Sequence, residues 1–292
     1  MASDLEATGD GTYLLWQRFS YVYPTPVRRL HHRLVVVPPA VHGDQWRLDH
    51  RVSVSASPVL VSVGTDGFGN HVVEVRAAEV AADIEFEAWA LVARHGPGGE
   101  TAVAAAALGD HRLLAATPLT RADAAMAAAA RELSAKGGGI GLAERACSWA
   151  HAALTYEYGI TGVRTTAAGA VAGGRGVCQD FAHVMVALCR AAGLPARYVS
   201  GHLVGEGGSH AWVEVVVADP LRPGRATAMA FDPTHDRRAR WGYLSVAVGR
   251  DYADVAPTSG TYEGESGGVL SGGKRLALVD GDSDLPLAVA SV

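Results

Sequence analysis

The chain has 292 residues, of which 49% are hydrophobic and 19% are charged, and its formal net charge is −5. This composition is typical of a globular protein and excludes a chain that is disordered along its whole length. There is no surplus of basic residues to neutralise a phosphate backbone, so we expect no nucleic-acid partner.

Residues 12–108, which follow a short tail at residues 1–11, are predicted to form an antiparallel β-sandwich domain. Short stretches such as 52–56 and 71–76 alternate between apolar and polar residues, as half-buried strands do. Pairs such as Pro38-Pro39, Asp66-Gly67 and Gly69-Asn70 supply turns between them. Strands at this spacing, with almost no helix signal, are typical of a small sandwich.

From residue 109 the pattern changes, and residues 109–292 are predicted to form one α+β domain that includes the C-terminal strands. Three helices are expected, at residues 120–136, 142–156 and 178–192, with Gly137 and Gly193 ending the first and the third. Strands are expected at residues 197–204, 210–218, 228–232 and 276–279. The predicted fold class is therefore α+β, with helices packed on an antiparallel sheet after the sandwich.

The segment from Gly268 to Lys274 (GVLSGGK) nearly fits a phosphate-binding loop. Arg275 stands where such a loop needs Ser or Thr, and too few residues follow for a long helix. We therefore interpret this segment as a turn between strands.

Cysteine usage distinguishes one of the three thiols. Cys147, Cys178 and Cys189 include no C-x-x-C pair, which argues against both a disulfide framework and a structural zinc site. Cys147 and Cys189 fall inside predicted helices among apolar residues, where cysteine acts as a small hydrophobic filler. No uncharged apolar run of about 18 residues and no leader pattern is present, so we expect no membrane contact and a cytoplasmic location.

Cys178 is predicted to lie on the first turn of a helix, directly after Gly176 and Val177. Unpaired backbone N–H groups and the positive end of the helix dipole favour a thiolate at this position. The thiolate is the attacking form of cysteine, and the Cys178 backbone N–H is placed to donate to an oxyanion. This pattern indicates a nucleophilic cysteine.

His210 and Asp232 are the expected partners of this thiol. His210 begins one predicted strand and Asp232 ends the next, so antiparallel pairing would bring them together on one face. Trp212 and Glu214 share that face, whereas Val213 and the alternate valines after it point into the core. A carboxylate beside an imidazole fixes its tautomer and stabilises its charged form.

The chain resembles the bacterial transglutaminase-like superfamily along nearly its whole length. The resemblance rests on GVCQDFAH (176–183), RYVSG (197–201), HAWVE (210–214) and FDPT (231–234), and on YVYPTPV (21–27), DGFGN (66–70) and GRDYADVAP (249–257) in the flanks. It implies a papain-like Cys-His-Asp triad at Cys178, His210 and Asp232, and no cofactor. His202 departs from the pattern, because similar proteins often carry Tyr there.

The implied chemistry is acyl transfer from a peptide or protein amide through a thioester on Cys178, resolved by water or by a primary amine. The expected substrate cleft is lined by Tyr156, Gln179, Tyr198, His202 and Trp212. Two alternatives stay open: a catalytically idle scaffold that binds a protein partner, and a zinc hydrolase that uses Cys178, His202 and His210. The sequence carries no signal for the oligomeric state.

Overall fold

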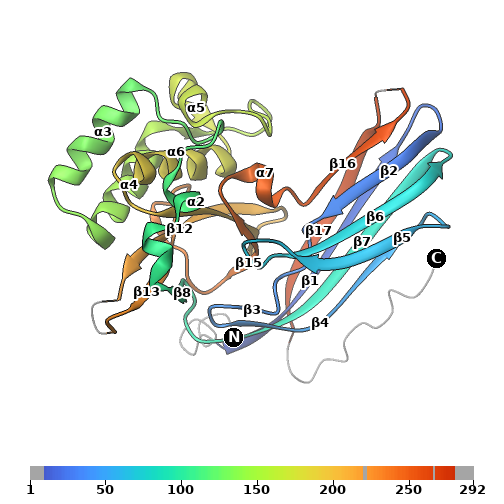
Figure 1. Cartoon of the computed structure of the whole chain (residues 1–292), viewed down its shortest axis with the longest axis horizontal. Coiled ribbons are helices and arrows are strands. Elements are labelled where there is room, and N and C mark those ends of the chain that lie inside the picture. The colour runs from blue at the N-terminus through green and yellow to red at the C-terminus, as the bar shows by residue number, and fades with distance from the viewer. Residues whose placement is uncertain (1–9, 220–221, 266, 280–292) are drawn as a thin grey trace.

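The computed structural model of the chain describes residues 10–219, 222–265 and 267–279. It contains helices packed on one antiparallel sheet, next to a sandwich of two further antiparallel sheets (Figure 1). The predicted α+β fold class is confirmed. Residues 1–9 of the predicted tail lie outside the described residues, and the first strand begins at Asp10, inside that tail. No described helix has the length and apolar character needed to cross a membrane.

The sandwich is built from strands whose alternate side chains are buried. In the first strand, Tyr13, Leu15, Gln17 and Phe19 are buried, while the residues that alternate with them are partly or fully exposed. One sheet has the order β17 (Val269–Val279), β1 (Asp10–Val22), β7 (Asp83–His95), β4 (Gln45–Val54) and β3 (Val41–His42). The other has the order β16 (Thr258–Glu263), β2 (Val27–Leu34), β6 (His71–Val80) and β5 (Leu60–Thr65).

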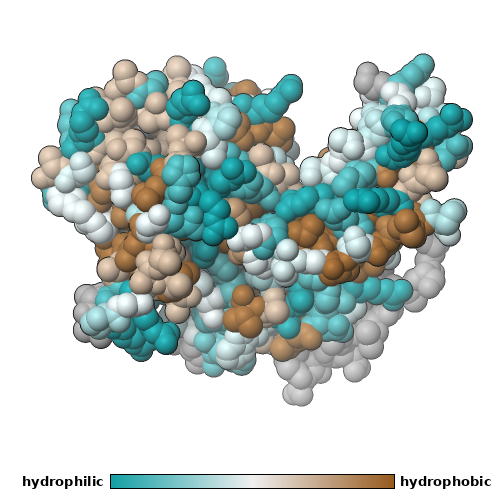
Figure 2. Space-filling model, in the orientation of Figure 1, coloured by the Kyte–Doolittle hydropathy of each residue, from teal (hydrophilic) through white to brown (hydrophobic). Residues whose placement is uncertain are grey.

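The edge strand β5 exposes hydrophobic side chains, and Figure 2 shows hydrophobic residues gathered along this part of the sandwich. Leu60, Val61 and Val63 are all more than half exposed. An uncovered edge strand of this kind offers unpaired backbone groups beside apolar surface.

The third sheet has the order β14 (Arg237–Arg238), β13 (Arg225–Asp232), β12 (His210–Ala218), β11 (Ala196–Leu203) and β15 (Tyr243–Gly249), with β8 (Glu100–Ala104) also paired to β13. Helices cover one face of this sheet: α3 (Ala124–Ala135), α4 (Gly139–Ala153), α5 (Ala167–Gly173) and α6 (Cys178–Ala191). Its other face packs against the sandwich, where Leu244 and Val246 contact Tyr13 and Leu15. The remaining elements are η1 (Ala105–Gly109), α2 (His111–Leu114), β9 (Thr155–Tyr156), β10 (Arg175–Gly176) and α7 (Tyr252–Val255).

The sheets do not follow the predicted division at residues 108 and 109. Strand β8 pairs with β13, although it precedes that boundary, and the C-terminal strands β16 and β17 pair with β2 and β1 of the sandwich. The pairing therefore places the C-terminal strands β16 and β17 in the sandwich, whereas the sequence assigned them to the second domain. A division into two independent folding units stays a prediction.

The glycine-rich segment before Lys274 is part of β17, so the predicted turn is wrong. Strand β17 pairs with β1 without interruption from Val269 to Val279. Glycine is needed here for close approach, because a Cβ on Gly272 would lie 2.4 Å from the carbonyl oxygen of Arg18. The phosphate-loop likeness thus arises from strand packing.

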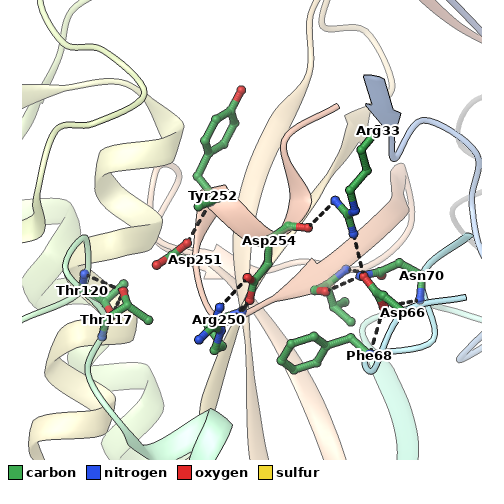
Figure 3. A network of polar contacts seen from close by, with 12 residues as sticks. Arg33, Asp66, Phe68, Asn70, Thr117, Thr120, Arg250, Asp251, Tyr252 and Asp254 are labelled. Atoms are coloured by element: carbon green, nitrogen blue, oxygen red, sulfur yellow. Dashed lines mark hydrogen bonds and ion pairs between the residues drawn. The ribbon is translucent and has the colours of Figure 1, made fainter. Parts of the chain in front are cut away.

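Polar contacts join the sandwich to the third sheet, as Figure 3 shows. Asp66 accepts hydrogen bonds from the backbone N–H groups of Phe68 and Asn70, and this forms a tight turn. The buried amide of Asn70 then donates to the carbonyl of Val248 and accepts from its N–H, at 2.7 and 2.8 Å. Arg33 bridges Asp66 to the carbonyl of Asp254. The DGFGN segment therefore fixes the two halves of the molecule against each other.

Candidate active site

Helix α6 begins at Cys178, as predicted, and a buried carboxylate fixes its first turn. Asp180 Oδ2 accepts hydrogen bonds from the Val177 N–H at 2.8 Å and from Thr161 Oγ1 at 2.6 Å. A Cβ on Gly176 would lie 2.7 Å from the Cβ of Asp180, so only glycine leaves room for this carboxylate. Asp180 thus fixes the backbone at Val177, directly before Cys178 begins helix α6.

The three thiols differ in their surroundings, as the sequence suggested. Cys178 is partly exposed, whereas Cys147 and Cys189 are buried. Burial raises the pKa of Cys189 to about 12. Burial, with a contribution from the nearby Asp236 carboxylate, also raises the pKa of Cys147 well above its usual range. Neither buried thiol forms a thiolate near neutral pH, which leaves Cys178 as the candidate nucleophile among the three.

His210 lies between Cys178 and Asp232. Its Nε2 donates to Asp232 Oδ2 at 2.8 Å, and it also makes a side-chain hydrogen bond with Cys178. Since Nε2 serves Asp232, Nδ1 is the ring nitrogen left for the thiol. Burial lowers the pKa of His210, but the hydrogen bonds with Asp232 and Cys178 outweigh it and raise the pKa to about 10. His210 is therefore an imidazolium at neutral pH.

The contact between His210 and Asp232 is diagonal across the two strands. Strands β12 and β13 pair antiparallel with Val213 opposite Phe231, so Asp232 stands opposite Trp212 when the register is continued. Residues two places apart on one face of a strand pair lie within reach of each other. The predicted strands and the shared face are thus present, with His210 two residues from the position opposite Asp232.

Asp232 holds more groups than the sequence predicted. Its Oδ2 also accepts from His235 Nδ1 and from the Tyr243 hydroxyl, both at 2.7 Å, and its Oδ1 accepts from the Thr234 N–H at 2.9 Å. Burial by itself raises the pKa of Asp232, but the hydrogen bonds led by His210 hold it far below its usual range. Asp232 is therefore a fixed negative charge.

His235 and Tyr243 were missed by the sequence argument. His235 follows Asp232 by three residues in a turn, a spacing that could have suggested a second imidazole on this carboxylate. Tyr243 lies on β15, and nothing in the sequence relates it to Asp232.

Glu206 reaches the same imidazoles from the loop before β12. Its Oε2 lies 3.4 Å from His210 Nδ1 and its Oε1 lies 3.6 Å from His235 Nε2. The Glu206 side chain is 40% exposed, so this second carboxylate sits on the solvent side of the site.

Only two of the five predicted cleft residues are accessible. Tyr156 is 54% exposed, and Gln179 is partly exposed with its Nε2 3.4 Å from the Gly162 carbonyl. Tyr198, His202 and Trp212 are each no more than 3% exposed, so they pack beneath the site instead of lining a cleft. Trp212 lies against the His210 ring, with the ring centroids 6.2 Å apart.

The zinc-ligand set suggested by the sequence does not come together. His202 Nδ1 contacts the Gly208 carbonyl at 3.2 Å, and burial lowers the pKa of His202 to about 4. Among the described residues, the group with metal-ligand spacing is His210, Asp232 and His235, whose ligand atoms lie within 4.8 Å of one another. Both imidazoles already donate to Asp232 Oδ2, so the group is complete as a hydrogen-bonded cluster.

Two family models match separate parts of this chain. Residues 127–226 match the family described as transglutaminase-like superfamily, and residues 13–93 match the bacterial transglutaminase-like N-terminal region. An uncharacterized protein of Mycobacterium leprae is 43% identical over 129 residues, covering 41% of this chain and 43% of that protein. One of Mycobacterium tuberculosis is 36% identical over 142 residues, covering 44% and 45%. The matched region thus spans less than half the length of these relatives.

A solved structure shows the same fold at low identity. It is a candidate cysteine protease from Cytophaga hutchinsonii, 20% identical, with a TM-score of 0.68 over 94% of this chain and 93% of that one.

Proposed function

The chain belongs to the transglutaminase-like superfamily and carries its bacterial N-terminal region, and from that premise we propose that it is a thiol enzyme that forms an acyl-enzyme on Cys178. The observation that carries the proposal is the position of His210, which is hydrogen-bonded to Cys178 on one side and to Asp232 on the other. The substrate is a peptide or protein amide, and a primary amine is the acceptor where transfer occurs.

The first half-reaction uses three groups. The Cys178 thiolate attacks the amide carbonyl, and the N–H groups at the start of α6 stabilise the oxyanion. The His210 imidazolium then gives its proton to the amine as the C–N bond breaks, which leaves a thioester and a neutral imidazole. Asp232 stays ionised throughout and keeps the ring oriented through Nε2.

The second half-reaction decides between a hydrolase and a transferase. Neutral His210 takes a proton from water or from a primary amine, and that nucleophile displaces Cys178 from the thioester. The same three residues serve both outcomes, so the product depends on which nucleophile reaches the thioester first.

Within the cell we propose a cytoplasmic site of action.

The test is a peptide-library assay with and without an added primary amine. Cys178→Ala should abolish both hydrolysis and transfer, while Cys147→Ala, the same change at a buried thiol, should retain them. Turnover that survives Cys178→Ala would refute the proposal. A wild-type protein that binds a partner but yields no thiol-dependent product would favour the catalytically idle scaffold.

A further inference from the structure

The sandwich contributes one cation to the site. Lys274 lies on β17, opposite Gln17 of β1. Its ammonium donates to Ser209 Oγ at 3.0 Å and stands 5.5 Å from the centre of the Phe19 ring. Ser209 immediately precedes His210, so the last described strand of the sandwich reaches the loop that begins the catalytic strand.

Lysine is rare in this chain. Only two of its 25 basic residues are lysines, and the other, Lys136, is exposed at the end of α3. Lys274 is partly buried, and burial lowers its pKa, while the charge of Cys178 acts in the opposite direction. The lysine and the catalytic sulfur are thus close enough to interact electrostatically.

Lys274 differs in its partners from two other partly buried cations, Arg197 and Arg33. Arg197 is paired with Glu214 and Arg33 with Asp66, at 2.7 and 3.0 Å. Within the part of the chain that the structure describes, no carboxylate forms an ion pair with Lys274, and Cys178 is the group whose charge would raise the pKa of Lys274. A desolvated ammonium without a fixed carboxylate is costly unless a negative group reaches it.

The reaction removes that negative group. When the S–C bond forms and the C–N bond breaks, the sulfur becomes a neutral thioester and the His210 proton leaves with the amine. Among the described residues, no carboxylate then pairs with Lys274 in the acyl-enzyme. A carboxylate on the acyl donor would supply the negative charge beside the Lys274 ammonium.

We propose that Lys274 is a specificity-determining residue that binds a carboxylate of the acyl donor, so that amides bearing an acidic group beside the reacting carbonyl are the preferred substrates. This proposal rests on the proposed function, because it takes Cys178 as the acylated atom. It assigns substrate recognition to a strand of the sandwich, outside the triad.

Alkylation of Cys178 tests this without turnover. Iodoacetate and iodoacetamide transfer groups of similar size to the sulfur, and only iodoacetate carries a carboxylate. The rate ratio of iodoacetate to iodoacetamide at Cys178 should fall about fivefold in Lys274→Gln, the order expected for one close charge pair in a solvated site. Lys136→Gln should keep the wild-type ratio.

Two further variants separate charge from positioning. Ser209→Ala removes the hydrogen bond but keeps the ammonium, so the rate ratio of iodoacetate to iodoacetamide should stay close to that of the wild type. Lys274→Glu should lower this ratio below that of Lys274→Gln. An unchanged ratio in Lys274→Gln, or equal slowing with both reagents, would overturn the proposal. If the ratio shifts as expected but no peptide is turned over, the proposed function fails while the anion site stands.

Peptide amides give the matching substrate test. A pair of peptides that differ by Glu against Gln next to the reacting residue should show a wild-type preference for Glu, expressed mainly in KM. That preference should disappear in Lys274→Gln and persist in Lys136→Gln. A preference that Lys274→Gln leaves intact would contradict the assignment.

Discussion

The Asp232→Asn substitution should lower the pKa of His210 and change the pH profile of Cys178 alkylation. Asp232 accepts four hydrogen bonds, three on Oδ2 and one on Oδ1. An asparagine can place its oxygen toward His210, but its NH₂ group then faces the Thr234 N–H, so at least one contact is lost and the charge is removed. Without that charge the imidazolium is less stable, and the thiolate that depends on it is less populated.

The size of this effect follows from the burial of the pair. Hydrogen bonds to charged groups contribute about 1.5–3 kcal/mol each, and a shift of one pKa unit corresponds to about 1.4 kcal/mol. We therefore expect the pKa of His210 to fall from about 10 by about one to two units. Because His210 would keep its position beside Cys178 without its fixed counter-ion, the stability of the fold should drop by about 3–5 kcal/mol.

The assay is the rate of Cys178 alkylation by iodoacetamide across pH, together with denaturant unfolding. Glu214→Gln is the matched control, because Glu214 is also a buried carboxylate on β12, paired with Arg197 and His42 and without a contact to His210. That control should destabilise the fold without moving the alkylation profile. A folded Asp232→Asn protein whose alkylation profile equals that of the wild type would refute the reasoning.

Three further predictions concern the frame of the site. Gly176→Ala should displace Asp180, because the new Cβ would lie 2.7 Å from the Asp180 Cβ, and it should cost about 1–3 kcal/mol in a denaturation experiment; an unchanged unfolding midpoint would contradict this. Tyr243→Phe removes the hydroxyl bonded to Asp232 and to Arg237 Nε and should cost about 1–2 kcal/mol by the same measurement. The pKa of His210 is raised to about 10 in the folded protein. The contribution of His210 to the unfolding free energy is therefore complete below its pKa in the unfolded chain, about 6.5, and is lost as the pH rises toward 10. The unfolding free energy of His210→Gln should lack this decline, and parallel pH profiles would speak against the assignment.

The sequence predicted those parts of the fold whose signals are local. The helix at Cys178 was predicted from a glycine, a helix start and an apolar stripe, all within a few residues, and α6 spans Cys178–Ala191. The strand His210–Ala218 was predicted from alternation, and its buried valines do face the helices. Because period-two alternation fixes the face of each side chain, the meeting of His210 and Asp232 followed from those two strands.

What the sequence did not predict depends on contacts between distant segments. Strand β17 is paired with β1, more than 240 residues earlier, and no local pattern selects that partner. Gly272 looked like a turn residue, yet it serves the close approach of β1. For the same reason Tyr243 and Lys274 could not be assigned to the site: each is brought there by a strand whose neighbours are set by the whole fold.

Whether His210 keeps the Cys178 sulfur ionised can be measured from the ultraviolet absorbance of thiolate, titrated with pH in the wild type and in His210→Ala, with Cys178→Ser as the blank. Thiolate absorbance should be present in the wild type at neutral pH, and it should be weaker in His210→Ala at the same pH. Equal thiolate absorbance in the two proteins at neutral pH would contradict a thiolate held by His210.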